Sequence, residues 1–223
     1  MTRATPSCDT ERVTADPPGR RQSGTSAIER PRLLGRLDAA LSHRLTSVIG
    51  GPGSGKTTLL AQWSANQRTI HHTAAPGDSL VGLMQTIVEG IRPEIMQLDE
   101  ALSMVIDGSG LPTTDWEPAQ GDAVAATLCD QVARAFATTD ITLVVDDVHL
   151  FESDSDAIDL LVGLVRHAPP ALHLVLASRQ ELPFPTNRLV IDGLATEIDT
   201  ADLAFTADEI QLLLDLDLMW HLL

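Results

Sequence analysis

Residues 50–58 form a glycine-rich stretch with one lysine, and their spacing is that of a phosphate-binding loop. The pattern G-x-x-x-x-G-K-[ST] is matched in full by Gly50, Gly55, Lys56 and Thr57. Glycines allow consecutive backbone amides to turn inward around a phosphate, the lysine ammonium reaches the outer phosphates, and the threonine hydroxyl ligates Mg²⁺. The stretch therefore predicts a nucleotide site whose contacts are Gly50, Gly51, Pro52, Gly53, Ser54, Gly55, Lys56, Thr57 and Thr58.

The flanks of this loop favour the same interpretation. Residues 45–49 are a short apolar run with β-branched side chains, and residues 57–63 have a helical pattern that should end near Gln67. The motif requires a strand, a loop and a helix in that order, whereas an incidental glycine-rich turn would need neither neighbour. The spacing of the loop glycines also misses the G-x-G-x-x-G pattern, which argues against a dinucleotide-binding loop.

A second element follows about 90 residues later, where the apolar run Ile141–Val145 ends in two carboxylates. An uninterrupted apolar run is typical of a strand that is covered on both faces of a parallel sheet. Asp146 is the candidate Mg²⁺ ligand together with Thr57, and Asp147 is the candidate that orients or activates the attacking water. A strand followed by an acidic turn is the alternative, but the phosphate loop upstream favours a Walker B element.

Residues 171–179 have a further apolar strand pattern, which ends in a serine and an arginine. At the carboxyl edge of a sheet, Arg179 would point toward the phosphates and contact the γ-phosphate through a forked hydrogen bond. A surface arginine without this role is the alternative. The predicted catalytic residues are Lys56, Asp147 and Arg179.

The 223 residues are enough for one domain with a sizeable core. No apolar run reaches the roughly 18 residues of a membrane span, and no apolar stretch follows the charged N-terminus. Cys8 and Cys129 are too few for a disulfide framework or a metal cluster. We therefore expect a cytoplasmic protein without a membrane partner.

The net charge of −16 is unevenly distributed, because residues 1–36 hold seven arginines and four acidic residues while the remainder holds eight basic and 27 acidic residues. Because the part of the chain after residue 36 is strongly acidic, it is a poor candidate for direct contact with a nucleic-acid backbone. Lys56 is the only lysine in the chain. Since the guanine-specificity motif N-K-x-D needs a second lysine, adenine is the expected base.

The remaining segments frame these motifs. Residues 1–29 hold hardly any apolar side chains and are expected to be disordered. Thr206 and Glu209 predict a capping box at the start of a last helix. Residues 215–223 are so apolar that we expect the chain to be cut short there. Periodicity and turn residues predict helices at 31–41, 78–91, 93–105, 122–137 and 157–167 and a loop at 107–121. They also predict a strand at 68–74 and one or two strands within 188–204, of which residues 195–199 are the expected sheet member.

Together these segments resemble the ATPase module of large bacterial LuxR-type, MalT-like regulators, which belong to the STAND class of signal-transduction ATPases. The resemblance covers roughly residues 30–214. It implies an α/β fold of the P-loop NTPase type, with three layers and a mainly parallel five-stranded sheet in the order 5-1-4-3-2. The stretches that carry the resemblance are residues 29–63, Leu143–Leu150, Leu174–Arg179, Leu182–Pro183, Arg188–Leu189 and Ala201–Thr206.

The resemblance also implies a function. The module would bind ATP or ADP with Mg²⁺, act as a slow switch, and self-associate when ATP is bound. Residues placed near the adenine by the resemblance are Arg30, Arg32 and Leu33. In the family, downstream sensor domains and a helix-turn-helix DNA-binding domain complete the switch, and we expect this chain to lack them.

We therefore expect residues 30–214 to be an ATP/ADP-binding module with weak Mg²⁺-dependent ATPase activity. A stand-alone P-loop phosphotransferase is one alternative, but it would need a second basic pocket. Between the two Walker elements only three arginines are available for it, Arg68, Arg92 and Arg134. The other alternative is a truncated, non-catalytic fragment that acts only by protein interaction, which the apolar C-terminal end favours.

Overall fold

The structure is a computed structural model that describes residues 28–78, 80–95, 118–152 and 155–220. Its strands form one sheet in the order β2-β3-β4-β1-β5, with every neighbouring pair parallel. This is the predicted order read from the other edge of the sheet, so the predicted α/β fold is confirmed. The strands are β1 (Leu45–Ile49), β2 (Thr69–Thr73), β3 (Ile141–Asp146), β4 (Leu172–Ser178) and β5 (Ala195–Ile198).

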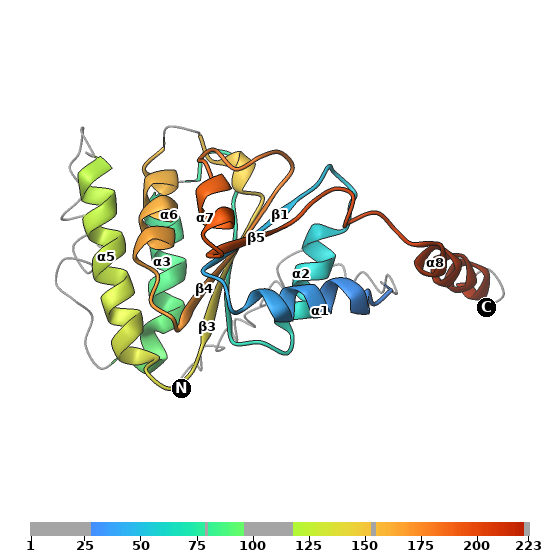
Figure 1. Ribbon diagram of the computed structural model, residues 1–223, viewed down its shortest axis with the longest axis horizontal. Coiled ribbons are helices and arrows are strands. Elements are labelled where there is room, and N and C mark those ends of the chain that lie inside the picture. Colours follow the sequence, from blue (N-terminus) through green and yellow to red (C-terminus); the bar gives the residue numbers. More distant parts are fainter. Residues whose placement is uncertain (1–27, 79, 96–117, 153–154, 221–223) are drawn as a thin grey trace, which may run out of the picture.

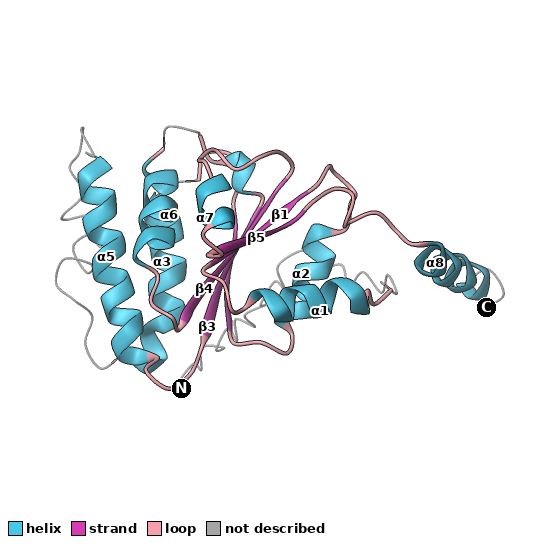
Figure 2. Ribbon diagram, viewed as in Figure 1, coloured by secondary structure: helices cyan, strands magenta, loops and turns pink. Residues whose placement is uncertain are grey.

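Helices cover both faces of the sheet and make a three-layer arrangement (Figures 1 and 2). One face packs against α1 (Pro31–Ala40) and α2 (Lys56–Ser64). The other face packs against α3 (Leu80–Ile91), α5 (Pro118–Ala135) and α6 (Asp156–His167). The remaining described helices are α7 (Asn187–Ile191), α8 (Ala207–Trp220) and two 3₁₀ turns, η1 (Arg92–Glu94) and η2 (Val148–Leu150).

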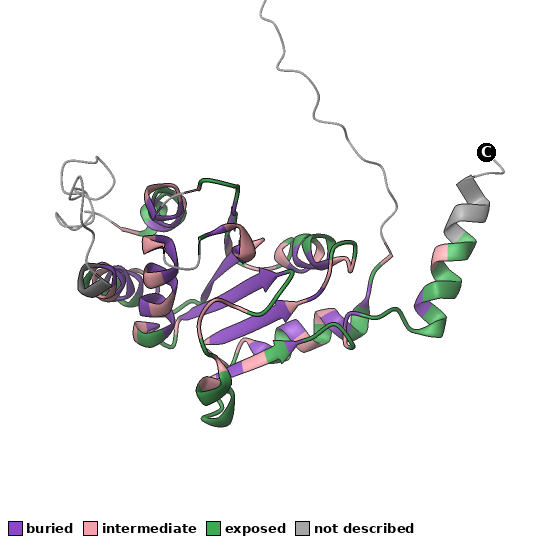
Figure 3. Ribbon diagram, turned by 90° about the horizontal axis from the view of Figure 1, so that it is seen from above, coloured by how far each residue is buried: buried purple, intermediate pink, exposed green. Residues whose placement is uncertain are grey.

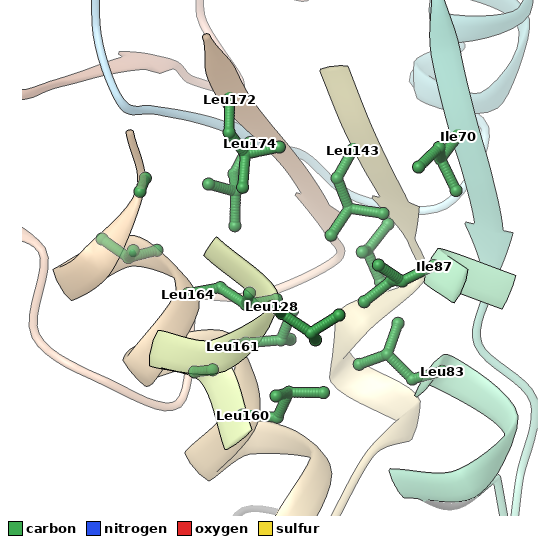
Figure 4. Close-up of a cluster of buried hydrophobic side chains, with 14 of the residues drawn as sticks. Ile70, Leu83, Ile87, Leu128, Leu143, Leu160, Leu161, Leu164, Leu172 and Leu174 are labelled. Atoms are coloured by element: carbon green, nitrogen blue, oxygen red, sulfur yellow. The ribbon is translucent and has the colours of Figure 1, made fainter. Parts of the chain in front are cut away.

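The central strands β3 and β4 are buried at every position, as expected for strands covered on both sides (Figure 3). Their alternate side chains supply the two hydrophobic clusters that hold the layers together. The larger cluster lies under α3, α5 and α6, and Figure 4 shows its members Ile70, Leu83, Ile87, Leu128, Leu143, Leu160, Leu161, Leu164, Leu172 and Leu174. The sheet is therefore a rigid support for the loops at its carboxyl edge.

One boundary predicted from the sequence was wrong. Helix α5 begins at Pro118, where a loop was predicted up to residue 121; a proline is well tolerated in a first helical turn. Of the one or two strands predicted within 188–204, the structure has one, β5, and residues 187–191 form the helix α7. After α7 the chain turns at Gly193, whose positive φ of 67° suits glycine, and then enters β5.

Several predictions lie outside the described residues: the N-terminal leader up to residue 27, the helix beyond residue 95 and the loop up to residue 117. The capping box of the last helix is confirmed, because the Thr206 N–H donates to the Glu209 carboxylate at 3.0 Å and the Glu209 N–H to the Thr206 hydroxyl at 3.3 Å. Within the described residues, none of the helices is both long and apolar enough to cross a membrane.

A histidine buried in β4 connects this strand to β1 and to the chain before it. The Nδ1–H of His173 donates to the carbonyl oxygen of His43 at 2.5 Å, and its Nε2 lies 3.1 Å from the Thr46 hydroxyl. Burial lowers the pKa of His173, and this outweighs the hydrogen bond to His43, which favours the charged form. The folded protein therefore holds a neutral imidazole at this position.

This burial predicts a loss of stability toward acid pH. The unfolded chain keeps the ordinary histidine pKa of 6.5 and binds more protons below it than the folded chain does. The free energy of unfolding should thus fall between about pH 7.5 and about pH 5.5, by at most about 1.4 kcal/mol per pH unit. Urea unfolding at both pH values measures the fall. In His173→Asn, which does not titrate here, the fall should be smaller; an equal fall in both proteins would contradict the assignment.

Candidate functional site

The phosphate loop, residues 50–55, joins the end of β1 to the start of α2, as predicted. Gly53 and Gly55 have φ values of 79° and 85°, a region in which a side chain is strained. Gly50 needs to be glycine for a different reason. A Cβ atom on it would stand 2.6 Å from Leu203 Cδ1 and 2.9 Å from Ser54 Oγ. Local torsions and close packing thus explain why this loop is rich in glycine.

Lys56 opens α2 and is buried beneath the loop. Its Nζ donates to the carbonyl oxygens of Gly50 at 2.5 Å and Gly51 at 3.2 Å. Burial lowers the pKa of Lys56, while the nearby carboxylates of Asp146 and Asp147 act in the opposite direction. The ammonium group therefore stands inside the loop, at the position from which it would reach bound phosphates.

Asp146 and Thr57 form the oxygen pair that the sequence analysis assigned to Mg²⁺. The Thr57 hydroxyl donates to Asp146 Oδ2 at 2.6 Å, and the Asp147 N–H donates to Asp146 Oδ1 at 2.8 Å. Asp146 is fully buried. A hydroxyl and a carboxylate are hard oxygen donors of the kind that Mg²⁺ takes from proteins, together with water and phosphate oxygens, so these residues fit the ion.

Asp147 follows β3 in a left-handed conformation, with φ of 56°, and it is the one non-glycine residue with positive φ among the described residues. Its Oδ1 has two nitrogen neighbours, the Nε of the Arg179 guanidinium at 3.7 Å and the Nδ1 of the His149 imidazole at 3.6 Å. The His149 Nδ1 is buried and has no hydrogen-bond partner in the described part of the chain. Strained backbone at a polar cavity is a frequent mark of functional residues.

His149 was missed by the sequence analysis. Its signal is local, two residues after Asp147 in the run Asp-Asp-Val-His. The 3₁₀ turn η2 starts directly after Asp147 and brings the imidazole back toward the carboxylate. That turn is invisible in the apolar periodicity from which strands and helices were predicted.

A cavity of about 300 Å³ at the carboxyl edge of the sheet unites these groups. Its walls come from both sides of the site, because the phosphate loop and α2 form one wall while the ends of β3 and β4 form the other. The residues that line it are Pro52, Gly53, Gly55, Lys56, Thr57, Thr58, Asp147 and Arg179. The structure thus brings together the three residues predicted to be catalytic and most of the predicted phosphate contacts.

The three residues predicted near the adenine are placed differently. Leu33 has no exposed surface and packs in the cluster under α1 and α2. Arg32 donates to the carbonyl oxygens of Asp202 and Ala204 at 2.8 and 3.3 Å. Arg30 is buried, with its Nη1 on the side of Gly55. Arg30 is therefore the member of this group that reaches the phosphate loop.

Comparison with known proteins places these features in a family. The family model described as the AAA ATPase domain matches residues 27–177. The HTH-type transcriptional regulator MalT of Serratia proteamaculans is 29% identical over 188 residues, which are 82% of this chain and 20% of that protein. MalT of Yersinia enterocolitica is 27% identical over 194 residues, with 85% and 20% covered. The chain thus spans about a fifth of the length of these curated relatives.

Solved structures show the same fold at low identity. A signal-transduction ATPase with numerous domains (STAND) and a tetratricopeptide repeat sensor, from Pyrococcus horikoshii, is 12% identical with a TM-score of 0.56, over 82% of this chain and 24% of that one. The Orc1 protein of Aeropyrum pernix, solved in complex with DNA, is 16% identical with a TM-score of 0.52, over 85% and 49%. At these identities the likeness concerns the fold alone.

The strain at Asp147 gives a direct test of the site geometry. Asp147→Gly and Asp147→Ala both remove the carboxylate, but only alanine keeps the Cβ atom that makes a left-handed conformation costly, by roughly 1–2 kcal/mol. After the greater freedom of glycine in the unfolded chain is subtracted, the glycine variant should be the more stable by about 0.5–1 kcal/mol.

Urea unfolding of the two variants measures this difference. The matched control is the same pair of substitutions at Asp159 within α6, where alanine should be the more stable by about 1 kcal/mol. An alanine preference at both positions would mean that Asp147 is not held in the left-handed conformation.

Proposed function

Because the chain belongs to the AAA ATPase domain family, we propose that residues 30–214 bind ATP or ADP with Mg²⁺ and hydrolyse ATP slowly, as the nucleotide switch of a LuxR-type transcriptional regulator. The cavity that joins the phosphate loop to Asp147 and Arg179 carries this proposal. The likeness to MalT regulators supports the regulatory setting. We propose neither sensing nor direct nucleic-acid contact for these residues, since they are strongly acidic and span only a fifth of those relatives.

Binding would use groups that the fold already holds in place. The backbone N–H groups of the phosphate loop, other than that of Gly50, which donates to Ser178, and the first turn of α2 would present positive partial charge to a phosphate. Lys56 would exchange its hydrogen bonds to the Gly50 and Gly51 carbonyls for phosphate oxygens. Thr57 and Asp146 would hold Mg²⁺, which when bound neutralises charge on the phosphate oxygens. The chain's single lysine leaves it without the guanine motif N-K-x-D, so adenine is the proposed base.

Hydrolysis would depend on the groups opposite the loop. Asp147 would accept a hydrogen bond from the attacking water and orient it, and Arg179 would balance the charge that develops on the γ-phosphate. In this structure Arg179 lies 3.7 Å from the carboxylate of Asp147. A γ-phosphate would draw the guanidinium away and leave Asp147 to the water, with His149 still beside it. Arg179 would then both detect the γ-phosphate of ATP and free the Asp147 carboxylate to act on the water.

Two wider features belong to the proposal. We propose that ATP favours self-association of the module, which is how the MalT-like resemblance implies that such a switch signals. We also propose a cytoplasmic location, because the MalT relatives of this chain are bacterial transcriptional regulators. The proposed self-association would depend on ATP binding at the nucleotide site.

Nucleotide binding can be tested on the chain's only lysine. An amine-reactive acylating reagent should reach Lys56 through the cavity that this residue lines, and the lowered pKa of Lys56 leaves more of its amine unprotonated and reactive. The N-terminal amine is the internal reference. Saturating ADP with Mg²⁺ should slow the modification of Lys56 at least about tenfold and leave the N-terminus unchanged. Peptide mapping by mass spectrometry reads both sites.

Calorimetry completes this test. The wild-type chain should bind ADP and ATP with Mg²⁺, and Lys56→Ala should bind at least about a hundredfold more weakly, the loss of roughly 2.7 kcal/mol that a buried charge-assisted contact supplies. Circular dichroism checks that the variant is folded. If Lys56→Ala binds as well as wild type, or ADP does not protect Lys56, the site assignment is wrong.

The role of Asp147 predicts a separation of turnover from binding. Asp147→Asn keeps the size of the side chain but removes the base, so phosphate release at saturating ATP should fall about a hundredfold or more while the Kd for ATP changes less than about threefold. His149→Ala should also slow turnover, because it removes the imidazole that flanks this carboxylate. Asp140→Asn, at the opposite end of β3, is the matched control and should turn over normally; an unimpaired Asp147→Asn would remove Asp147 from the mechanism.

A further inference from the structure

Three arginines near the start of the domain hold the segment that leads to its last helix. This segment, residues 199–206, is called the linker here; it runs from the end of β5 to the start of α8, which stands apart from the sheet (Figures 1 and 3). Arg32 and Arg36 bind it from its exposed side, through the Asp202 carbonyl and the Asp202 carboxylate respectively. Arg30 binds it from the buried side.

The buried contacts of Arg30 all use one nitrogen. Its Nη2 donates to the carbonyl oxygens of Leu203 at 2.9 Å and Ala204 at 3.0 Å, and to Glu209 Oε2 at 3.1 Å. The guanidinium also lies 4.3 Å from the centre of the Phe205 ring. The Nη2 of Arg30 thus binds both the linker and the first turn of α8.

The other donors of this guanidinium are unused. Arg30 is 4% exposed, and its Nε and Nη1 are buried with no hydrogen-bond partner among the described residues. Buried donors on a charged group are rarely left unpaired, because their desolvation is costly. Nη1 lies 3.9 Å from the position of a Cβ on Gly55, so this donor is on the side of the phosphate loop. An acceptor from outside the chain would satisfy it.

The linker itself also touches the phosphate loop. Leu203 is buried, and its Cδ1 would stand only 2.6 Å from a Cβ on Gly50. The same residue supplies one of the carbonyl oxygens that hold Arg30. Both ends of the loop therefore lie beside residues that hold the start of α8. Leu203 of the linker lies beside Gly50, and Arg30 lies beside Gly55.

Glu209 links Arg30 to the cap of α8. Its Oε2 accepts from both the Thr206 N–H and Arg30, so the capping box shares an oxygen with the arginine. Burial alone would raise the pKa of Glu209, but the hydrogen bonds from Thr206 and Arg30 and the charges of Arg30 and Arg32 lower it below its ordinary value. The carboxylate is held in its charged form, and the start of α8 depends on it.

From these contacts we propose that Arg30 couples nucleotide binding to the position of α8: its Nη2 fixes the linker and the α8 cap, and its Nη1 binds an acceptor atom of the nucleotide beside Gly55. The inference rests on the proposed function, since it needs a nucleotide in the cavity. Both sets of contacts use different nitrogens of one rigid plane and can exist together. We expect the coupling to be positive, so that the bound nucleotide and the fixed start of α8 stabilise each other.

Hydrogen exchange and calorimetry test the coupling from its two ends. Exchange of the amides in residues 203–210 is followed by mass spectrometry with and without ADP and Mg²⁺, and the Kd for ADP is measured on the same proteins. In the wild type, ADP should slow this exchange about fivefold or more, within the usual range for coupled sites. Arg30→Ala should abolish the slowing and weaken ADP binding.

Glu209→Gln keeps Arg30 in the chain and removes only the charge that fixes it. Because coupling is reciprocal, this variant, which is remote from the cavity lining, should weaken ADP binding about fivefold. Arg36→Ala is the matched control: it removes one of the two arginine contacts to Asp202 in the linker but leaves Arg30 in place. Its Kd for ADP and its exchange response should stay within about twofold of wild type.

The outcomes are distinct. ADP binding with unchanged exchange at residues 203–210, or a full exchange response that survives in Arg30→Ala, would overturn the coupling and leave the nucleotide site standing. Normal ADP affinity in Glu209→Gln would also overturn it. No ADP binding by the folded wild type would overturn the proposed function and the coupling together.

Discussion

The hydrogen-bonded register of three parallel strands decides where every chemical group of the site stands. Ile49 at the end of β1 pairs with Ser178 at the end of β4, and Val145 near the end of β3 pairs with Leu176. The Gly50 N–H then donates to the Ser178 carbonyl at 3.1 Å and carries the ladder into the phosphate loop. Parallel strands end at the same edge, so a loop, two carboxylates and an arginine that are far apart in sequence become neighbours. A slip of one residue would turn these side chains to the opposite faces.

The edge where the strands end concentrates features that a stable fold would otherwise avoid. Asp147 has a left-handed backbone, Lys56 is a buried ammonium group, and Arg30 and His149 keep buried nitrogens without hydrogen-bond partners in the described residues. Each of these lowers stability, by roughly 1–3 kcal/mol for a typical strained or unpaired group. The fully buried strands β3 and β4 and the two hydrophobic clusters offset that cost. Such a distribution is expected where the polar groups are arranged for a ligand rather than for one another.

Local patterns in the sequence were sufficient for the strands and for the loop, because the central strands are unbroken apolar runs and the loop needs glycines at fixed spacing. They do not reveal contacts between residues that are distant in sequence. Arg30 meets Leu203 across 173 positions of sequence, and Leu33, placed near the adenine by resemblance, packs in the core under α1. Residues 188–191 have strand-forming side chains, but β5 already occupies the free edge beside β1, and α7 forms before the turn at Gly193. Side-chain pairing over such separations cannot be read from periodicity.

The cationic groups around the cavity differ in how firmly the protein holds them, and this difference suits a switch. Arg179 is 49% exposed and lies 3.7 Å from Asp147, so their attraction is worth at most about 1 kcal/mol and a γ-phosphate can replace it. Arg30 is 5% exposed and makes three hydrogen bonds with the linker and α8, and breaking a buried pair of this kind costs about 3–5 kcal/mol. In the proposed site, Arg179 would lie on the side where ATP and ADP differ, while Arg30 would lie on the side that the two nucleotides share. Asp147 and Arg179 would distinguish ATP from ADP. The position of α8 would respond to the binding of either nucleotide.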